Sequence, residues 1–454
     1  MTPDKVVDLL LRGPGFWAEQ AKLIARSAKG AEAPLRALAC VQKAAEAPFD
    51  SAMAYERATF LELRGSEQAA ALRAVFFAER AAPRPAALQD VTPLPLPHVG
   101  VIGGGTMGAG IAAALRDAGL PVTLIERDAE AVARGMANLS AIFDGAVTRG
   151  KLTEAQAEAR LAGVTGSSDY TALAEADLVI EAVFEEISVK RAVFEQLDRI
   201  CRADAVLATN TSYLDPRAIT EGLSNPARFL ELHFFSPANV MKLLEIVPVP
   251  ETAPQTLATG FALARRLGKI PVQAGICEGF IGNRILKRYR EAAERLVRQG
   301  GSIAAIDAAM RRYGFAMGPF EAQDLGGLDI AFLQREGVRA AGRAVAETLG
   351  DILVRAGRKG QKSGGGWYDY APGDRKPRPS ATTAGLLANQ ITPGPEIACD
   401  EIADHLVGEM VLEGKAILAE GIAQRPQDID LVEVHGYGFP RWRGGPMFAT
   451  RDRV

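Results

Sequence analysis

The chain has 454 residues, enough for two to four compact units, because a single hydrophobic core seldom grows past about 250 to 300 residues. Its hydrophobic fraction of 48%, charged fraction of 24% and formal net charge of -3 offer no basic field for a polyanion, so we expect no nucleic-acid partner. The four cysteines lie far apart without a CxxC pair, which argues against a disulfide framework or a zinc site. We therefore expect no metal and a reducing compartment.

The start of the chain lacks the long apolar core and small-residue cleavage site of a secretory signal. No run of about 18 apolar residues occurs further along, so we expect no membrane span. These two features together predict a cytoplasmic location.

Residues 1–97 are predicted to form a helical segment followed by a linker. The segment is rich in Ala, Leu, Glu and Arg, and between 52 and 82 apolar residues recur at spacings of three and four, as in an amphipathic helix. Five prolines between 83 and 97 then break regular helix and ladder hydrogen bonding, which predicts an extended linker. A new domain is expected to begin near His98.

Residues 98–275 change to short apolar runs separated by helical stretches. This alternation predicts βαβ units with strands buried on both faces, and hence a largely parallel sheet of the α/β Rossmann type. The predicted strands cover residues 99–102, 122–125, 178–183, 206–208, 229–235 and 243–247.

The strand signal ends near residue 275, and amphipathic helices are predicted at 281–299, 303–313 and 330–349. We therefore expect an all-helical domain over 276–371. The stretch 357–395 is polar and rich in glycine and proline, which predicts loop and linker.

A weak internal repeat indicates that the helical part is duplicated, with the second copy at 394–454. The segments Ile306-Asp307, Tyr313-Gly314-Phe315 and Gly318-Pro319-Phe320 recur as Ile429-Asp430, Gly436-Tyr437-Gly438-Phe439 and Gly445-Pro446-Met447-Phe448.

The segment HVGVIGGGTMGAGIAAAL carries a Gly103-x-Gly105-x-x-Gly108 loop between an apolar strand and an alanine-rich helix. The first glycine permits the tight turn, the second lets backbone approach a pyrophosphate, and the third allows close helix packing. Such a motif alone is weak, but the next predicted strand ends in Glu126, where a dinucleotide-binding fold carries an acid. The loop, including Thr106 and Met107, therefore predicts a dinucleotide site.

The Glu126 carboxylate would accept hydrogen bonds from ribose hydroxyls and repel a 2′-phosphate, so NAD is favoured over NADP. The adjacent Arg127 could instead accommodate a phosphate. Its more common interpretation is a solvated surface charge.

Among only four histidines, His233 ends one predicted strand, and Glu245 follows twelve residues later in the next. Two successive strands can return the chain so that the carboxylate orients the imidazole and stabilises it as it takes a proton. The alternative is a buried histidine that merely satisfies the hydrogen-bonding need of a carbonyl.

Two further polar groups lie at places where substrates bind in such folds. Ser212 belongs to the tripeptide Asn210-Thr211-Ser212 that closes a predicted strand, although this tripeptide is also common turn chemistry. Asn283 opens the helical domain in EGFIGNR, where a helix start or interdomain hydrogen bond would explain it equally well.

Together the motifs resemble the 3-hydroxyacyl-CoA dehydrogenase family, specifically the dehydrogenase half of bifunctional fatty-acid β-oxidation enzymes. GGGTMGAGIA, TNTS, HFFSPANVMKLLEIV, EGFIGNRIL and GQKSGGGWYDY occur in the family's order across 98–454. The resemblance implies that His233 is the catalytic base, that Glu245 is its partner, and that Ser212 and Asn283 hold the substrate oxygen. It also implies NAD contacts by Glu126, Glu185, Lys190 and Lys362. Without it, the last three would be read as surface charges.

The function that follows is NAD-dependent oxidation of a 3-hydroxyacyl-CoA to a 3-ketoacyl-CoA in fatty-acid β-oxidation. One alternative is a β-hydroxyacid dehydrogenase with a lysine base, against which the histidine-glutamate pair argues. The other is an NAD- or acyl-CoA-binding remnant without turnover.

The two ends of the chain depart from the family pattern. Residues 34–82 resemble the end of a hydratase domain whose body would precede the first residue, so we expect no hydratase activity and predict that Phe76 and Phe77 pack on the dehydrogenase or stay exposed. The second helical copy is expected to be truncated, which leaves monomer and homodimer both open.

Overall fold

A computed structural model describes residues 14–340, 342–395 and 397–451. Residues 1–13 of the predicted helical segment and 452–454 of the predicted second copy therefore lie outside the described residues. The chain divides into two compact units: a helical unit of Met1–Leu72, Ile285–Glu413 and Gly438–Val454, and a sheet unit of Arg73–Arg284 and Gly414–Tyr437. Each unit is described by itself.

The sheet unit is built on eight strands in the order β3-β2-β1-β4-β5-β6-β7-β8. All neighbouring strands run parallel except β6 and β7, so the predicted largely parallel sheet is confirmed. The strands are β1 (Val99–Ile102), β2 (Val122–Ile125), β3 (Val164–Ser167), β4 (Leu178–Glu181), β5 (Val206–Thr209), β6 (Phe229–Phe234), β7 (Leu243–Val247) and β8 (Ile270–Gln273).

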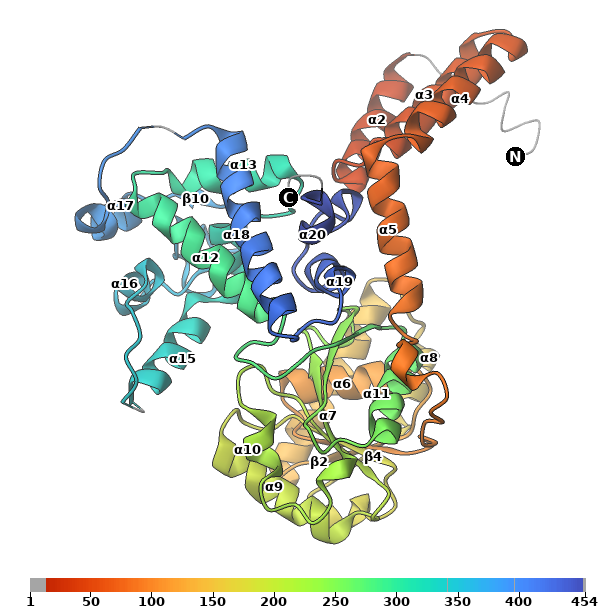
Figure 1. The fold of residues 1–454 in the computed structure, drawn as a ribbon, viewed down its shortest axis with the longest axis vertical. Coiled ribbons are helices and arrows are strands. Elements are labelled where there is room, and N and C mark those ends of the chain that lie inside the picture. The colour runs from red at the N-terminus through yellow and green to blue at the C-terminus, as the bar shows by residue number, and fades with distance from the viewer. Residues whose placement is uncertain (1–13, 341, 396, 452–454) are drawn as a thin grey trace. The chain divides into compact units, whose positions relative to one another are not determined.

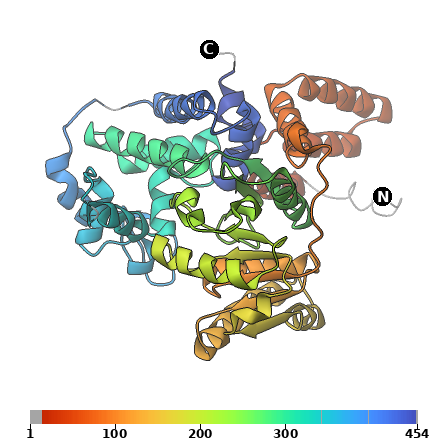
Figure 2. The ribbon, with the colours of Figure 1, turned by 60° about the horizontal axis from the view of Figure 1, so that its bottom comes forward.

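Helices connect these strands and cover both faces of the sheet (Figures 1 and 2). They are α6 (Thr106–Asp117), α7 (Ala129–Thr148), α8 (Glu154–Leu161), α9 (Ile187–Ile200), α10 (Pro216–Thr220) and α11 (Pro254–Arg266), with short 3-10 turns at Ala86–Leu88, Tyr170–Leu173 and Pro226–Arg228. The helix α19 (Pro426–Gly436), which carries the Ile429-Asp430 segment of the second copy, packs against β7 and β8.

Two hydrophobic cores lie on the opposite faces of the sheet. One joins side chains such as Val101 and Leu124 to Ile111 of α6 and Phe143 of α7. The other joins Val179 and Leu207 to Phe194 of α9, which is yellow-green in Figure 1. Because strand side chains alternate between the faces, Glu181, Thr209 and His233 share the α9 face with this second core at the carboxyl ends of their strands.

The strand order reverses at β1, whose neighbours are β2 on one side and β4 on the other. In open α/β sheets, ligands bind outside the carboxyl ends of the strands at such a switch point. The fold therefore places the glycine loop after β1 at the expected dinucleotide-binding position.

The helical unit contains the N-terminal helices and most of the repeated part. Its elements are α2 (Pro14–Ala28), α3 (Ala33–Glu46), α4 (Phe49–Arg64), α13 (Ile303–Tyr313), α14 (Pro319–Gly326), α15 (Leu328–Ala340), α16 (Leu349–Arg355), α17 (Ala381–Leu387), α20 (Pro446–Ala449), the 3-10 turns Gln361–Ser363, Ala388–Gln390 and Arg441–Arg443, and the paired strands β9 (Tyr368–Asp369) and β10 (Arg378–Pro379). Three helices contribute residues to both units: α5 (Glu67–Ala81), α12 (Gly282–Arg298) and α18 (Cys399–Ala419).

The repeat predicted from the sequence has a structural counterpart. In the first copy α13 is followed by α14, with Gly318 as N-cap and a proline in its first turn. In the second copy α19 is followed by α20, with Gly445 as N-cap and again a proline in the first turn. Each copy of the motif therefore has a helix followed by a shorter helix that begins at a Gly-Pro pair, with the 3-10 turn Arg441–Arg443 between the two helices in the second copy.

Several predicted elements need correction. The expected helix over 52–82 is two helices, because α4 ends before Gly65 and the Ser66 hydroxyl accepts a hydrogen bond from the first turn of α5. The expected helix over 330–349 ends at Ala340, and α16 begins separately behind the capping hydroxyl of Thr348. The stretch 357–395 is not only loop and linker, because it contains α17, β9 and β10.

A buried carboxylate ties the helices of the first copy together. The Asp307 carboxylate accepts hydrogen bonds from the amides of Phe320 and Glu321 at 3.0 and 3.1 Å and from the Tyr368 hydroxyl at 2.7 Å. Asp307 has no exposed surface, and burial raises its pKa to about 7 despite these hydrogen bonds. The helix α14 is thus capped at its start by an acid that titrates near neutral pH.

The raised pKa of Asp307 predicts that the free energy of unfolding depends on pH. The folded pKa lies above the unfolded value of about 3.9, so the folded state binds the proton more tightly and loses stability as pH rises from about 4 to 7. Relative to Asp307→Asn, the wild type should lose about 2 kcal/mol of unfolding free energy between about pH 5 and about pH 8. Urea titrations of both proteins at each pH measure this, and a constant gap between them would contradict the assignment.

Candidate functional site

The glycine loop after β1 has the geometry that a dinucleotide needs. Gly103 has a φ of +95°, in the region that favours glycine. A Cβ at Gly108 would lie 1.7 Å from the Gly103 carbonyl oxygen, whereas a Cβ at Gly105 would meet no described atom within 4 Å. The helix start is therefore pressed against the strand, and the backbone at Gly105 borders open space. Among the described residues no side chain caps α6, so its first N–H groups can bind an anion.

Thr106 and Met107, predicted to bind the cofactor, lie in the first turn of α6. Glu126 follows β2, and its Oε1 accepts a hydrogen bond from the Gly104 amide at 2.7 Å. The predicted acid therefore lies beside the loop and fixes it. Arg127 is exposed and pairs with Asp128 at 3.1 Å, which agrees with a solvated charge.

The structure brings His233 and Glu245 together as the sequence predicts. They are direct partners in the antiparallel register of β6 and β7, and the distance between Nδ1 and Oε2 is 2.7 Å. The histidine is 3% exposed and the glutamate is fully buried, which strengthens their interaction through the low local dielectric. The carboxylate thus fixes the ring and leaves Nε2 as the nitrogen that can exchange a proton with a ligand.

The second oxygen of Glu245 holds the start of α12. Its Oε1 accepts hydrogen bonds from the amides of Ile281 and Gly282, each at 3.2 Å. A carboxylate at a helix N-terminus is favoured by the free amides and by the helix dipole. One buried side chain therefore couples the orientation of His233 to the position of the next residue, Asn283.

Ser212 lies directly beside the base. Its Oγ and the Nε2 of His233 share a hydrogen bond of 3.3 Å. The turn that carries the serine is held by Glu185, whose Oε1 accepts hydrogen bonds from the Thr211 hydroxyl and from the Ser212 amide at 2.9 Å. Glu185 is thus a support of the serine turn and is 38% exposed.

Lys190 differs from the surface charge that its sequence context alone suggests. Its side chain is fully buried, and Nζ donates to both oxygens of Glu181 at 2.8 and 3.0 Å and to the Asn210 carbonyl at 3.2 Å. The Thr209 hydroxyl also donates to Glu181 at 2.6 Å. Nζ also lies 3.7 Å from Glu185, the residue that holds the serine turn. The lysine therefore supports this turn through both Asn210 and Glu185.

A further buried acid, Glu231, was missed by the sequence analysis. It lies on β6 two residues before His233, has no exposed surface, and accepts no hydrogen bond of ordinary geometry from the described residues. Burial raises its pKa well above the usual range, and the nearby carboxylates of Glu185 and Glu245 raise it further. The neutral acid is therefore favoured. The sequence feature that could have indicated this buried acid is a glutamate inside an otherwise apolar run.

Aromatic rings enclose the histidine on two sides. The ring centroids of Phe235 and Phe280 lie 4.5 and 5.5 Å from that of His233. The ring of Tyr437 packs edge to face on Phe235 at 5.7 Å. The rings of Phe235 and Phe280 shield the base from water, and Tyr437 is another residue that the sequence analysis did not assign to the site.

Lys362 lies in the helical unit, where its Nζ pairs with Asp329 at 2.5 Å. Its side chain is 51% exposed, and it is therefore open to a further anionic partner. Lys362 and the other predicted site residues belong to different units of the chain.

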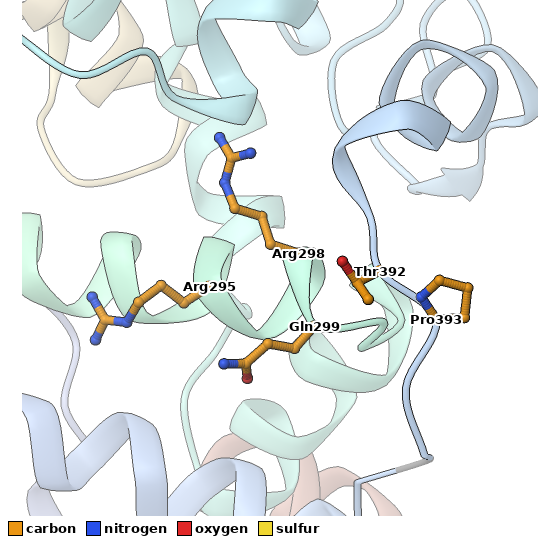
Figure 3. Close-up of a pocket in the computed structure, with 5 residues that line it drawn as sticks. All are labelled: Arg295, Arg298, Gln299, Thr392 and Pro393. Carbon is orange, nitrogen blue, oxygen red and sulfur yellow. The ribbon is translucent and has the colours of Figure 1, made fainter.

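A cavity of 540 Å³ in the helical unit is separate from this set of residues. It is lined by Arg295, Arg298, Gln299, Thr392 and Pro393. Figure 3 shows that the two guanidinium groups point away from each other, and they donate instead to Glu409 and Gln390. Because both arginines are already paired with other residues, we assign the cavity no chemistry.

The described residues include neither a membrane-spanning helix nor a metal-binding cluster. None of their helices is long and apolar enough to cross a membrane. Nor do three or more of their His, Cys, Asp or Glu side chains group in a way that could hold a metal ion.

Comparison with family models matches two adjacent stretches of the chain. Residues 98–277 match the 3-hydroxyacyl-CoA dehydrogenase NAD binding domain, and residues 279–370 match the C-terminal domain of the same family. The first stretch contains the glycine loop, Ser212 and the histidine-glutamate pair, and the second contains Asn283.

Similar proteins cover nearly the whole chain. A peroxisomal bifunctional enzyme of Cavia porcellus is 37% identical in an alignment that covers 95% of this chain and 63% of that protein. A peroxisomal fatty acid beta-oxidation multifunctional protein of Arabidopsis thaliana is 35% identical in an alignment that covers 87% of this chain and 56% of that protein. The chain thus spans less than two thirds of these relatives.

A solved structure supports the same relationship. The crystal structure of 3-hydroxybutyryl-CoA dehydrogenase from Escherichia coli superposes with a TM-score of 0.69 at 31% identity, over 79% of this chain and 92% of that chain.

Proposed function

Because the chain belongs to the 3-hydroxyacyl-CoA dehydrogenase family, we propose that it oxidises 3-hydroxyacyl-CoA to 3-ketoacyl-CoA with NAD, as a step of fatty-acid β-oxidation. The observation that carries the proposal is the buried His233-Glu245 pair with the Ser212 hydroxyl on its free nitrogen. This is the arrangement that removes a proton from an alcohol held at the serine.

In the proposed mechanism His233 takes the hydroxyl proton of the substrate through Nε2. Glu245 keeps the ring in the required tautomer through Nδ1 and stabilises the imidazolium that forms. Ser212 and Asn283 hold the substrate oxygen, so that the reacting carbon is oriented before the reaction. NAD supplies the acceptor for the hydride that leaves this carbon.

The residues present fit NAD. Gly103, Gly105, Thr106, Met107 and Gly108 form the cradle for its pyrophosphate, where the open space beside Gly105 and the uncapped amides of α6 support the proposal. Glu126 would bind the adenosine ribose.

Three charged residues complete the proposed cofactor set. Glu185 and Lys362 keep exposed surface and can contact NAD directly. For Lys190, whose side chain is buried, we propose an effect on the cofactor through the 210–213 turn that it supports.

The preference for NAD over NADP tests the proposed role of Glu126. Glu126→Gln keeps an acceptor for the Gly104 amide but removes the charge that repels a 2′-phosphate, so the preference for NAD over NADP should fall about tenfold. The ratio of kcat/KM for the two cofactors measures it. Arg127→Ala is the matched control, and an unchanged ratio in Glu126→Gln would remove Glu126 from cofactor selection.

NADH oxidation with acetoacetyl-CoA tests the activity itself, followed by absorbance. Turnover supports the dehydrogenase. NAD binding without turnover would favour the alternative of a binding remnant, and a reaction with free β-hydroxyacids in place of CoA esters would favour the other enzyme class.

Location and assembly belong to the proposal as well. The scattered cysteines support a cytoplasmic location, whereas two similar proteins are named peroxisomal, so cell fractionation decides between the two compartments. A monomer and a homodimer remain the two candidate states, which sedimentation distinguishes.

A further inference from the structure

The second helical copy reaches the candidate site through one tyrosine. Tyr437 follows the last residue of α19, and its hydroxyl donates to Oδ1 of Asn283 at 2.9 Å. The two residues are 154 positions apart in the chain, so the contact depends on the packing of α19 against β8 and against β7, the strand that carries Glu245.

Residues of the candidate site pack closely around the Tyr437 ring. A Cβ at Gly282 would lie 2.1 Å from the Tyr437 ring, and the ring packs on Phe235, which in turn contacts His233. Gly436 approaches β7 so closely that a Cβ there would lie 2.6 Å from Leu243. Glycines therefore permit both close approaches.

The segment that precedes Tyr437 is also fastened to the start of α12. The Gly275 amide donates to the Ile422 carbonyl at 2.7 Å, and Arg284 forms a bidentate pair with Glu420 at 2.6 and 2.8 Å. Bidentate arginine-carboxylate pairs fix geometry as well as charge. The second copy thus holds the residues on both sides of Asn283.

We propose that Tyr437 is a positioning residue for the dehydrogenase reaction: its hydroxyl fixes the Asn283 amide so that Nδ2 faces the substrate oxygen. A hydroxyl that donates to Oδ1 sets which end of the amide is presented, because a flipped amide would place its NH2 group there instead. The inference rests on the proposed function, since it assigns a partner to a group that holds the substrate oxygen.

Tyr437→Phe tests the role of the hydroxyl while keeping the ring against Phe235 and Gly282. We expect kcat/KM for the acyl-CoA substrate to fall about tenfold, since a small misplacement of a positioning group costs one to two orders of magnitude. The KM for NAD and the melting temperature should not change. Tyr313→Phe, at the equivalent motif position of the first copy, is the matched control and should keep wild-type kinetics.

A double-mutant cycle separates positioning from general support. If Tyr437 acts through Asn283, then Tyr437→Phe should lower activity no further when Asn283→Ala is already present. Additive losses, or an equal loss of NAD affinity and stability, would overturn the inference. Wild-type kinetics in Tyr437→Phe would do the same. An inactive wild type would instead contradict the proposed function.

Discussion

His233→Gln is expected to lower kcat by about two to four orders of magnitude, the usual contribution of a general base. The amide keeps a polar group between Ser212 and Glu245 but cannot take the substrate proton. NAD affinity should not change, because the glycine loop and Glu126 belong to other elements. Steady-state kinetics and NAD titration by fluorescence measure the two quantities.

Glu245→Gln serves as the companion variant. It leaves one oxygen for the amides of Ile281 and Gly282 but no charge to stabilise the imidazolium, so kcat should fall while the fold remains. Unchanged turnover in His233→Gln would remove the histidine from the mechanism and leave a structural role.

Lys190→Met is expected to lower the free energy of unfolding by about 3 to 5 kcal/mol. The change leaves the fully buried Glu181 carboxylate without its charged partner in a region that water does not reach. Hydrogen bonds from Thr209 and from the Val183 amide remain, but they do not neutralise the charge. Chemical denaturation followed by circular dichroism measures the loss.

The double variant Lys190→Met with Glu181→Gln controls for shape and packing. Removing both charges should recover most of the lost stability, since the cost of the single change is that of an unpaired buried charge. The single variant should also bind NAD more weakly, because the lysine supports the turn at Asn210. A double variant as unstable as the single one would show that packing, not charge, is responsible.

The sequence predicted the interior of the sheet better than its edges. The strands that read as continuous apolar runs were placed to within two residues, because burial on both faces leaves a strong local signal. The missed strands β3 and β8 are the two edges, with sequences VTGS and IPVQ. An edge strand is set by hydrogen bonds from its one neighbour and needs no apolar pattern of its own.

The residues of the candidate site also fall into those that the sequence predicted and those that it could not predict. The glycine loop and the His233-Glu245 pair were predicted because each follows from a local rule, a turn that needs glycine and two strands joined by a short return. The buried position of Lys190 could not be predicted, because a lysine is normally solvated and this one is buried only with Glu181.

The sequence by itself determined the family, the glycine loop, the acid that follows β2, and the pairing of His233 with Glu245. Only the tertiary structure decided that Glu231 is fully buried, that Lys190 contacts the Asn210 carbonyl, and that Tyr437 binds Asn283. The physical reason is that motifs record local backbone requirements, whereas burial and hydrogen bonds between distant residues exist only after the elements have packed.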